Sequence, residues 1–156
     1  MREIERLLSI YGESHQNPIN KSIHWICVPS IMFSLVGLIM HIPIFGEISL
    51  FKNWAVFALI LALIYYLRLS FIMFNGFLPI SFLLLYGNWE LMQYCTSHHC
   101  NSVITLLIIF IIAWIGQFIG HRIEGKKPSF LQDLQFLLIG PAWLLHFVYQ
   151  RLGINY

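Results

Sequence analysis

The sequence predicts an all-α membrane protein, a bundle of four to five transmembrane or re-entrant helices preceded by an amphipathic helix. Hydrophobic residues make up 58% of the 156 residues and charged residues only 10%, a balance far from that of soluble domains. Long apolar runs recur along the whole chain. Because no linker, repeat or low-complexity tract separates them, residues 1–156 are expected to form a single integral membrane domain.

The first two elements follow from the N-terminal pattern. Residues 1–11 predict a short amphipathic helix on a membrane surface, because apolar side chains recur there at helical spacing between charged ones. Asn20 or Ser22 is the expected N-cap of the next helix. The run WICVPSIMFSLVGLIM then supplies a first span of about 18–20 residues, the length that crosses a hydrocarbon core.

The remaining elements lie between residues 54 and 149. Residues 54–67 and 69–89 predict two spans with a turn near Arg68, since a single span would bury this arginine at membrane depth. Residues 102–120 form the next span. The last run, 134–149, is short and contains Gly140-Pro141, so it is expected either to cross a thin bilayer or to dip in and return.

The number of crossings sorts the histidines between the two membrane faces. Four crossings separate His24 from His121 and return the chain to the side it left, so both are expected at one face together with His15. Histidines reached after one or three crossings belong to the other face: His41, His98 and His99. Most lysines and arginines fall on the His15 side, which the positive-inside rule makes cytoplasmic. The host membrane would be the endoplasmic reticulum in a eukaryote or the inner membrane in a bacterium.

A polar stripe closes the run that ends near residue 120. Gln117, His121 and Glu124 recur at helical spacing and need polar partners at that depth. The candidates on the same face are His15, Asn17, Asn20 and His24. Several neutral imidazoles with a carboxylate nearby and no thiolate suit non-haem iron or a similar divalent ion better than structural zinc.

We therefore take His15, His24 and His121 as candidate metal ligands, and Asn17 and Asn20 as turn and cap residues. The alternative is that the histidines only make hydrogen bonds at helix ends.

A second histidine cluster lies in CTSHHC, residues 95–100. Cys95, His98, His99 and Cys100 resemble a zinc set, but tetrahedral sites usually draw their ligands from two separated segments. At an oxidising face, a Cys95–Cys100 disulfide or a pair of free thiols is the preferred interpretation.

Two blocks of the chain carry a family resemblance. YGESHQNPINKSIHWICVPS and GQFIGHRIEGKKPSFLQDLQFLLIGPAW resemble the signature regions of the yeast-type 2-hydroxy fatty acid dioxygenase family, small multi-span proteins of fatty acid α-oxidation in phytosphingosine (sphingolipid) degradation. The positions that match the first block are Tyr11, His15, Asn17, Pro18, Asn20, Ile23, His24, Val28 and Pro29. Those that match the second are Gln117, Phe118, Gly120, His121, Glu124, Lys126, Lys127 and Pro128. The chain departs from the yeast form at Gln16 and Phe147, where that form has histidine and glutamate, and in a shorter gap between His121 and Glu124.

The resemblance implies an Fe(2+)-dependent oxidoreductase that shortens a 2-hydroxy fatty acid by one carbon, with family histidines holding the metal. Glu124 is expected as a fourth ligand or as an acceptor that orients an imidazole ring. Lys126 or Lys127 is expected to steer the substrate carboxylate. The partners are then a 2-hydroxy fatty acid, O2 and the lipid bilayer, with no nucleic acid.

The expected overall reaction is RCH(OH)COOH + O2 → RCOOH + CO2 + H2O. Its balance requires no 2-oxoglutarate, flavin or nicotinamide, and the chain has no Gly-rich nucleotide loop. Two other classes of protein stay open at this point, a small membrane transporter and a non-catalytic membrane scaffold.

Overall fold

The computed structural model describes residues 2–44, 46–125 and 130–155, with side chains of the last segment described from Phe136 onward. Within these ranges the chain is helical and has no strand, so the predicted all-α class is confirmed. The helices are α1 (Glu3–Glu13), α2 (Pro18–Met40), α3 (Trp54–Leu69), α4 (Phe71–Ser97), α5 (Ser102–Glu124) and α6 (Phe130–Leu152).

Among the described residues, three helices are long and apolar enough to cross a membrane: α2, α4 and α5. Helix α3 is apolar but has only 16 residues, which corresponds to about 24 Å. The turn predicted near Arg68 is present. Ser70 has an extended backbone between α3 and α4, and its hydroxyl accepts a hydrogen bond from the Met73 backbone N–H at 3.4 Å.

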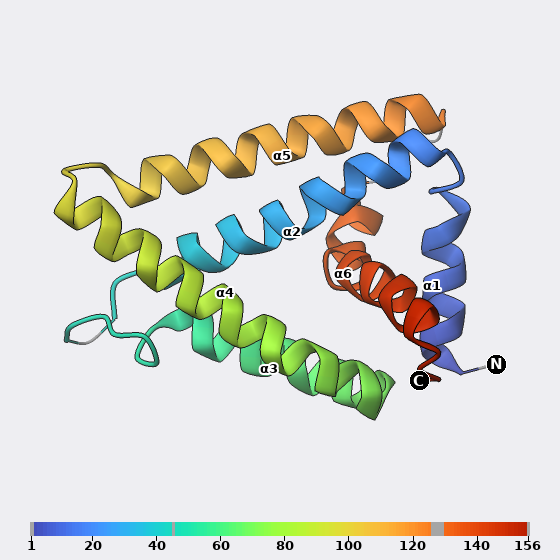
Figure 1. Ribbon diagram of the computed structural model, residues 1–156, viewed down its shortest axis with the longest axis horizontal. Helices are drawn as coiled ribbons and strands as arrows, with labels where there is room; N and C mark the ends of the chain where they lie inside the picture. The colour runs from blue at the N-terminus through green and yellow to red at the C-terminus, as the bar shows by residue number, and fades with distance from the viewer. Residues whose placement is uncertain (1, 45, 126–129, 156) are drawn as a thin grey trace.

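The four helices α2 to α5 alternate in direction, as the crossing argument requires (Figure 1). The N-terminal end of α2 and the C-terminal end of α5 therefore lie together at one end of the molecule, and the α4–α5 connection lies at the opposite end. Helices α2 and α5 form the most extensive helix pair, and α3 packs against α4.

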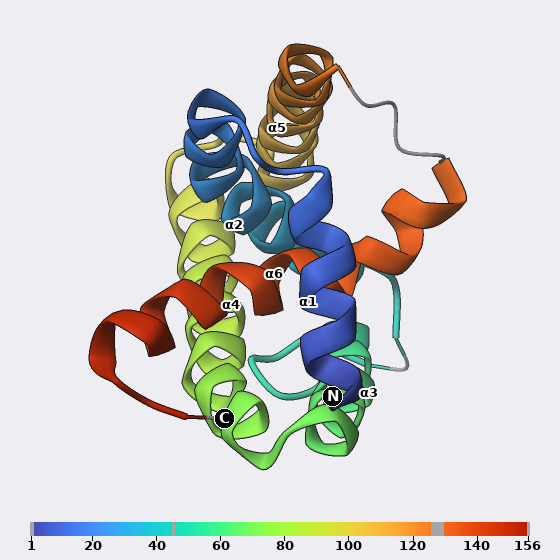
Figure 2. The same ribbon diagram turned by 90° about the vertical axis from the view of Figure 1, so that its right-hand side faces the viewer.

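The two pairs diverge, and α6 lies crosswise in the opening between them (Figures 1 and 2). It is helical through Gly140 and Pro141, so the interruption considered at this dipeptide does not occur. Ile139, Ala142 and Trp143 are buried at the centre of the main apolar core. Helix α6 thus fills the interior of the bundle.

Helix α1 closes the same opening from the outside (Figure 2). Its amphipathic character is as predicted, but its apolar face does not lie on the bilayer. Ile4, Leu8 and Tyr11 are instead buried in the apolar core that α6 also contributes to, and α1 packs against α6. The packing of α1 fixes the position of the loop that follows it, which carries His15.

Candidate metal centre

Helix α2 begins earlier than the sequence predicts. Its N-cap is Asn17, whose side chain accepts a hydrogen bond from the Ile19 N–H at 2.9 Å, and Pro18 occupies the first turn. The expected N-caps Asn20 and Ser22 lie inside the helix. A proline is preorganised for the first helical position, so α2 begins at Pro18, before the apolar run from which the boundary was predicted. The longer helix carries Asn20 and His24 one turn apart, both fully buried.

Close contact between α2 and α5 depends on two glycines, Gly116 and Gly120. A Cβ added at Gly120 would overlap the side-chain oxygen of Asn20, and one added at Gly116 would overlap the Cys27 sulfur. Small residues four apart let two helix backbones approach closely in a membrane. The GxxxG spacing in GQFIG is therefore a sequence signal for this contact.

The three predicted ligands converge at this end of the helix pair. Candidate ligand atoms of His15, His24 and His121 all lie within 4.8 Å of one another. His15 and His24 are fully buried and His121 is partly buried. The rings meet edge to face, with interplanar angles of 84°, 70° and 79° and centroids 4.3 to 5.4 Å apart. The α1–α2 loop, the first turns of α2 and the end of α5 thus present imidazoles to one small volume.

Hydrogen bonds fix the tautomers of the first two rings. Nδ1 of His15 lies 2.6 Å from the Tyr11 carbonyl oxygen, and Nδ1 of His24 lies 2.9 Å from that of Asn20. A carbonyl oxygen only accepts, so each Nδ1 carries the hydrogen and each neutral ring keeps a lone pair on Nε2. The two Nε2 atoms face each other at 2.9 Å.

Two lone pairs at that distance repel each other unless a cation or a proton lies between them. Burial lowers the pKa of His15 from 6.5 to about 4, which disfavours an extra proton on this ring at neutral pH. Two nitrogens each about 2.1 Å from one ion and about 90° apart would be separated by about 3.0 Å. The donor set, its tautomers and its spacing therefore fit a metal ion.

Glu124 holds the loop that carries His15. Its carboxylate accepts hydrogen bonds from the backbone N–H of Gln16 at 2.7 Å and of Asn17 at 2.9 Å, and from the Asn20 side chain at 3.0 Å. The carboxylate also lies at the N-terminus of α2, where the helix dipole favours negative charge. These contacts tie the end of α5 to the start of α2.

Two aromatic residues complete the surroundings. The Tyr11 ring stacks on His15 at a centroid distance of 4.1 Å, and Trp143 of α6 lies 5.2 Å from the same imidazole. Both are buried. In the sequence, Tyr11 is marked only by the family pattern and Trp143 by nothing, because a linear pattern does not predict that α6 crosses the bundle at this point.

A cavity of about 50 Å³ opens beside the histidines. His15 and His121 line it, together with the buried Gln117 of α5 and Tyr11. Ser14, Trp114 of α5 and residues of α2 and α6, most of them apolar, form the rest of its wall. Space next to the imidazoles is therefore available to a small polar group attached to an apolar chain.

Lys126 and Lys127, expected to steer a carboxylate, lie outside the described residues, as does Pro128. His146 lies on α6 outside the cluster of three histidines.

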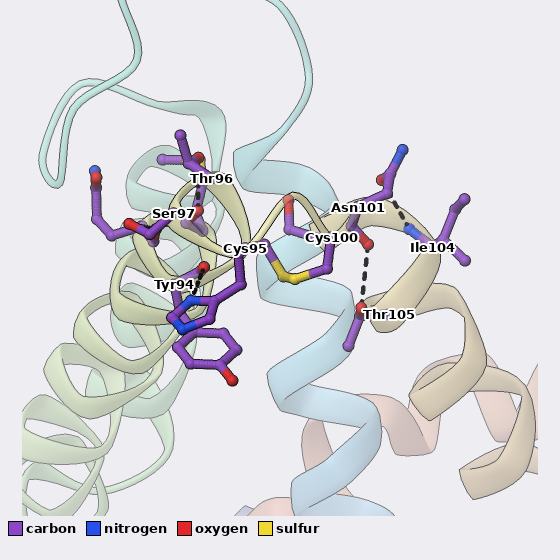
Figure 3. The surroundings of a disulfide bond; sticks show 12 residues. Tyr94, Cys95, Thr96, Ser97, Cys100, Asn101, Ile104 and Thr105 are labelled. Carbon is purple, nitrogen blue, oxygen red and sulfur yellow. Dashed lines mark hydrogen bonds between the residues drawn. A yellow bond between two sulfur atoms is a disulfide. The ribbon is translucent and has the colours of Figure 1, made fainter.

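The second histidine cluster lies at the opposite end of the bundle (Figure 3). Cys95 and Cys100 form a disulfide, so neither thiol is available to zinc and the preferred interpretation of CTSHHC is confirmed. His41 bonds to the Gly37 carbonyl at 2.7 Å and to the Ser102 hydroxyl at 2.8 Å, which ties α2 to α5 at this end.

Comparisons with known proteins show the family of the chain. A family model described as "2-hydroxy-palmitic acid dioxygenase Mpo1-like" matches residues 1–152. The chain is 30% identical over 153 residues to the 2-hydroxy-palmitic acid dioxygenase MPO1 of Saccharomyces cerevisiae, covering 97% of this chain and 82% of the yeast protein. No solved structure matches. The match runs through both blocks that supply the three histidines, and the chain belongs to the Mpo1-like family.

Proposed function

We propose that the chain is an iron(II)-dependent dioxygenase that converts a 2-hydroxy long-chain fatty acid into the fatty acid one carbon shorter. The observation that carries the proposal is the pair of Nε2 lone pairs facing each other at 2.9 Å, with His121 beside them. Membership of the Mpo1-like family and the name of the yeast relative support the substrate class. The two reactants, acid and O2, balance to the shorter acid, CO2 and water.

His15, His24 and His121 would hold the ion, which when bound supplies redox chemistry with O2 and a Lewis-acid site for the hydroxyl and carboxylate of the acid. The backbone carbonyls of Tyr11 and Asn20 hold two of the rings in the tautomer that offers Nε2. Tyr11 and Trp143 exclude water from one side of His15. Gln117, buried in the cavity wall, is placed to hydrogen-bond a polar group of the substrate.

Glu124 acts in this proposal as a positioning residue. Its carboxylate oxygens are engaged by the 15–17 loop and by Asn20, so its effect on the ion is exerted through the position of His15. Lys126 and Lys127 remain candidates for attracting the substrate carboxylate, since they come two and three residues after Glu124 in the sequence.

The histidine centre is proposed to lie at the cytoplasmic face. The disulfide lies at the other end of the long helices, and disulfides persist in oxidising compartments outside the cytoplasm. The distribution of lysine and arginine favours the same orientation.

The test adds iron(II) and 2-hydroxyhexadecanoic acid to detergent-purified protein in air and looks for pentadecanoic acid, CO2 and O2 consumption. His24→Ala and His121→Ala are expected to abolish the product. His98→Ala, an exposed histidine at the disulfide end, is expected to leave it unchanged. A wild-type protein that binds iron(II) but forms no shorter acid would refute the proposed reaction.

The purified protein, reconstituted into lipid vesicles, separates the two other classes of protein. A transporter would move metal or acid across a vesicle membrane without turnover. A scaffold would neither retain a divalent ion nor consume O2.

A further inference from the structure

One face of α2 is apolar along its whole length from the histidine centre inward. Beyond His24, the α2 positions that line two neighbouring cavities recur at helical spacing: Val28, Ile31, Met32, Leu35, Val36 and Ile39. A continuous stripe therefore leads from a candidate metal ligand toward the opposite end of α2.

The stripe borders two cavities that adjoin each other. The first, of about 50 Å³, is the cavity lined by His15 and His121. The second, of about 130 Å³, lies between α2, α3, α4 and α6. Met32 and Leu137 line both, so these two side chains form the boundary between them.

The second cavity offers almost no polar group to a ligand. Its polar side chains are Ser81 and Tyr66, and the Tyr66 hydroxyl already donates to the Leu138 carbonyl at 2.7 Å. Three alanines about one turn apart on α3, Ala55, Ala58 and Ala62, line the cavity, and their small side chains leave room opposite the α2 stripe. Such a space suits an unbranched alkyl chain better than a polar or aromatic ligand.

The length of the stripe matches one class of chain. From Val28 to Ile39 the axis of α2 rises about 16 Å. An extended alkyl chain with bonds of about 1.5 Å advances about 1.25 Å per carbon, so this distance holds about 13 carbons. The carboxyl and hydroxyl carbons at the histidines bring the total to about 15 or 16.

We propose that the two cavities form one acyl-chain site, in which the tail of the 2-hydroxy acid runs from the histidines past Met32 and ends between Ile39 and Ala55. This inference rests on the proposed function for the position of the polar head. Met32 and Leu137 then form a passage that long chains must cross, and the α3 alanines set the upper limit of chain length.

Two substitutions obstruct the site at different depths. Met32→Trp narrows the passage about 6 Å beyond Val28, so acids of about 8 carbons are still accepted and the 16-carbon acid is not. Ala58→Phe fills part of the second cavity, which Ala58 lines together with Val36, about 12 Å along α2 from Val28, and lowers the limit to about 12 carbons. Controls introduce the same aromatic side chains at exposed positions of the same helices, Ile26→Trp and Leu61→Phe.

The readout is binding of radiolabelled 2-hydroxy acids of 8, 12 and 16 carbons to metal-free protein, at one detergent concentration so that micelle partitioning is common to all variants. The ratio of affinities for 16 over 8 carbons is expected to fall at least tenfold in Met32→Trp and to keep its wild-type value in both controls. Ala58→Phe is expected to bind the 8- and 12-carbon acids normally and the 16-carbon acid at least tenfold more weakly.

A third variant covers the case in which added bulk prevents folding. Ile39→Ala enlarges the distal end and is expected to improve binding of an 18-carbon acid relative to the 16-carbon acid. Cobalt(II) binding at the histidines reports whether each variant is folded. Unchanged chain-length preference in all folded variants overturns the inference.

Turnover is measured separately with iron(II) and O2. A wild-type protein that shows the expected chain-length preference in binding but forms no product leaves the acyl-chain site intact and contradicts only the proposed reaction.

Discussion

Glu124→Gln is the sharpest test of how the fold positions the centre. The carboxylate meets three donors, the backbone N–H groups of Gln16 and Asn17 and the Asn20 amide. A glutamine offers one acceptor oxygen, and in either orientation its NH2 group faces one of these donors. Hydrogen bonds to a charged group contribute about 1.5 to 3 kcal/mol each, and leaving a donor unpaired adds to the cost.

We expect the change to weaken the contact between α5 and the 15–17 loop by about 2 to 3 kcal/mol. The loss stays below the sum of the three hydrogen bonds because Glu124 is only half buried and water can replace part of each contact. If that tie holds His15 in place, metal affinity falls about 10- to 100-fold, the usual range for a residue that orients a ligand. The assay is anaerobic titration of metal-free protein with cobalt(II), followed by its d–d absorption band. Glu47→Gln, an exposed glutamate in the α2–α3 connection at the other end, is the control and should leave affinity unchanged.

Two outcomes contradict this reasoning. An affinity within twofold of wild type means that the contacts of Glu124 do not position His15. Complete loss of binding, equal to that of His121→Ala, means that the carboxylate is itself a ligand. A partial loss together with a lower thermal stability is the expected result.

Three further predictions concern packing, pH and the distal disulfide. Gly120→Ala puts a methyl group against α2 and should lower the free energy of unfolding, measured by chemical denaturation, by about 1 to 3 kcal/mol. The control Gly12→Ala should lower it much less, because the added Cβ meets its nearest neighbour at 3.5 Å. The metal-free protein should lose thermal stability as the pH falls from 6.5 to about 4. The pKa of His15 is about 4 in the folded chain and about 6.5 in the unfolded chain, so protonation in this window favours the unfolded chain. His15→Gln should reduce the difference in thermal stability between pH 7 and pH 5. Replacing Cys95 and Cys100 by serine should lower thermal stability without changing cobalt(II) affinity, and altered affinity would show that the two ends of the bundle are coupled.

Local chemistry was sufficient for several features of this protein. Composition and apolar run length predicted the helical membrane class, and the polar cost of Arg68 at membrane depth predicted the α3–α4 turn. Counting crossings placed His24 and His121 at one end. These inferences succeed because each depends on one segment and its solvent, or on a parity that does not require knowing how helices pack.

The features that sequence reasoning missed depend on contacts between remote segments. The start of α2 was predicted too late, since the Asn17-Pro18 cap precedes the apolar run and is not part of its pattern. The burial of α1 and the crosswise position of α6 were not predicted either. In a helix such as α6, the apolar residues suit lipid and protein equally, so hydrophobic pattern alone does not state what covers them.

The sequence by itself determined which residue types are available at the centre, three imidazoles and no thiolate, and that they share one end of the bundle. Only the tertiary structure decided that two Nε2 lone pairs face each other, that the Glu124 carboxylate accepts hydrogen bonds from the loop beside His15, and that a cavity extends from the histidines along α2. The physical reason is that ring orientation and empty space are set by side-chain packing among α1, α2, α5 and α6. Such packing is a sum of many weak contacts between distant segments, and no local pattern encodes it.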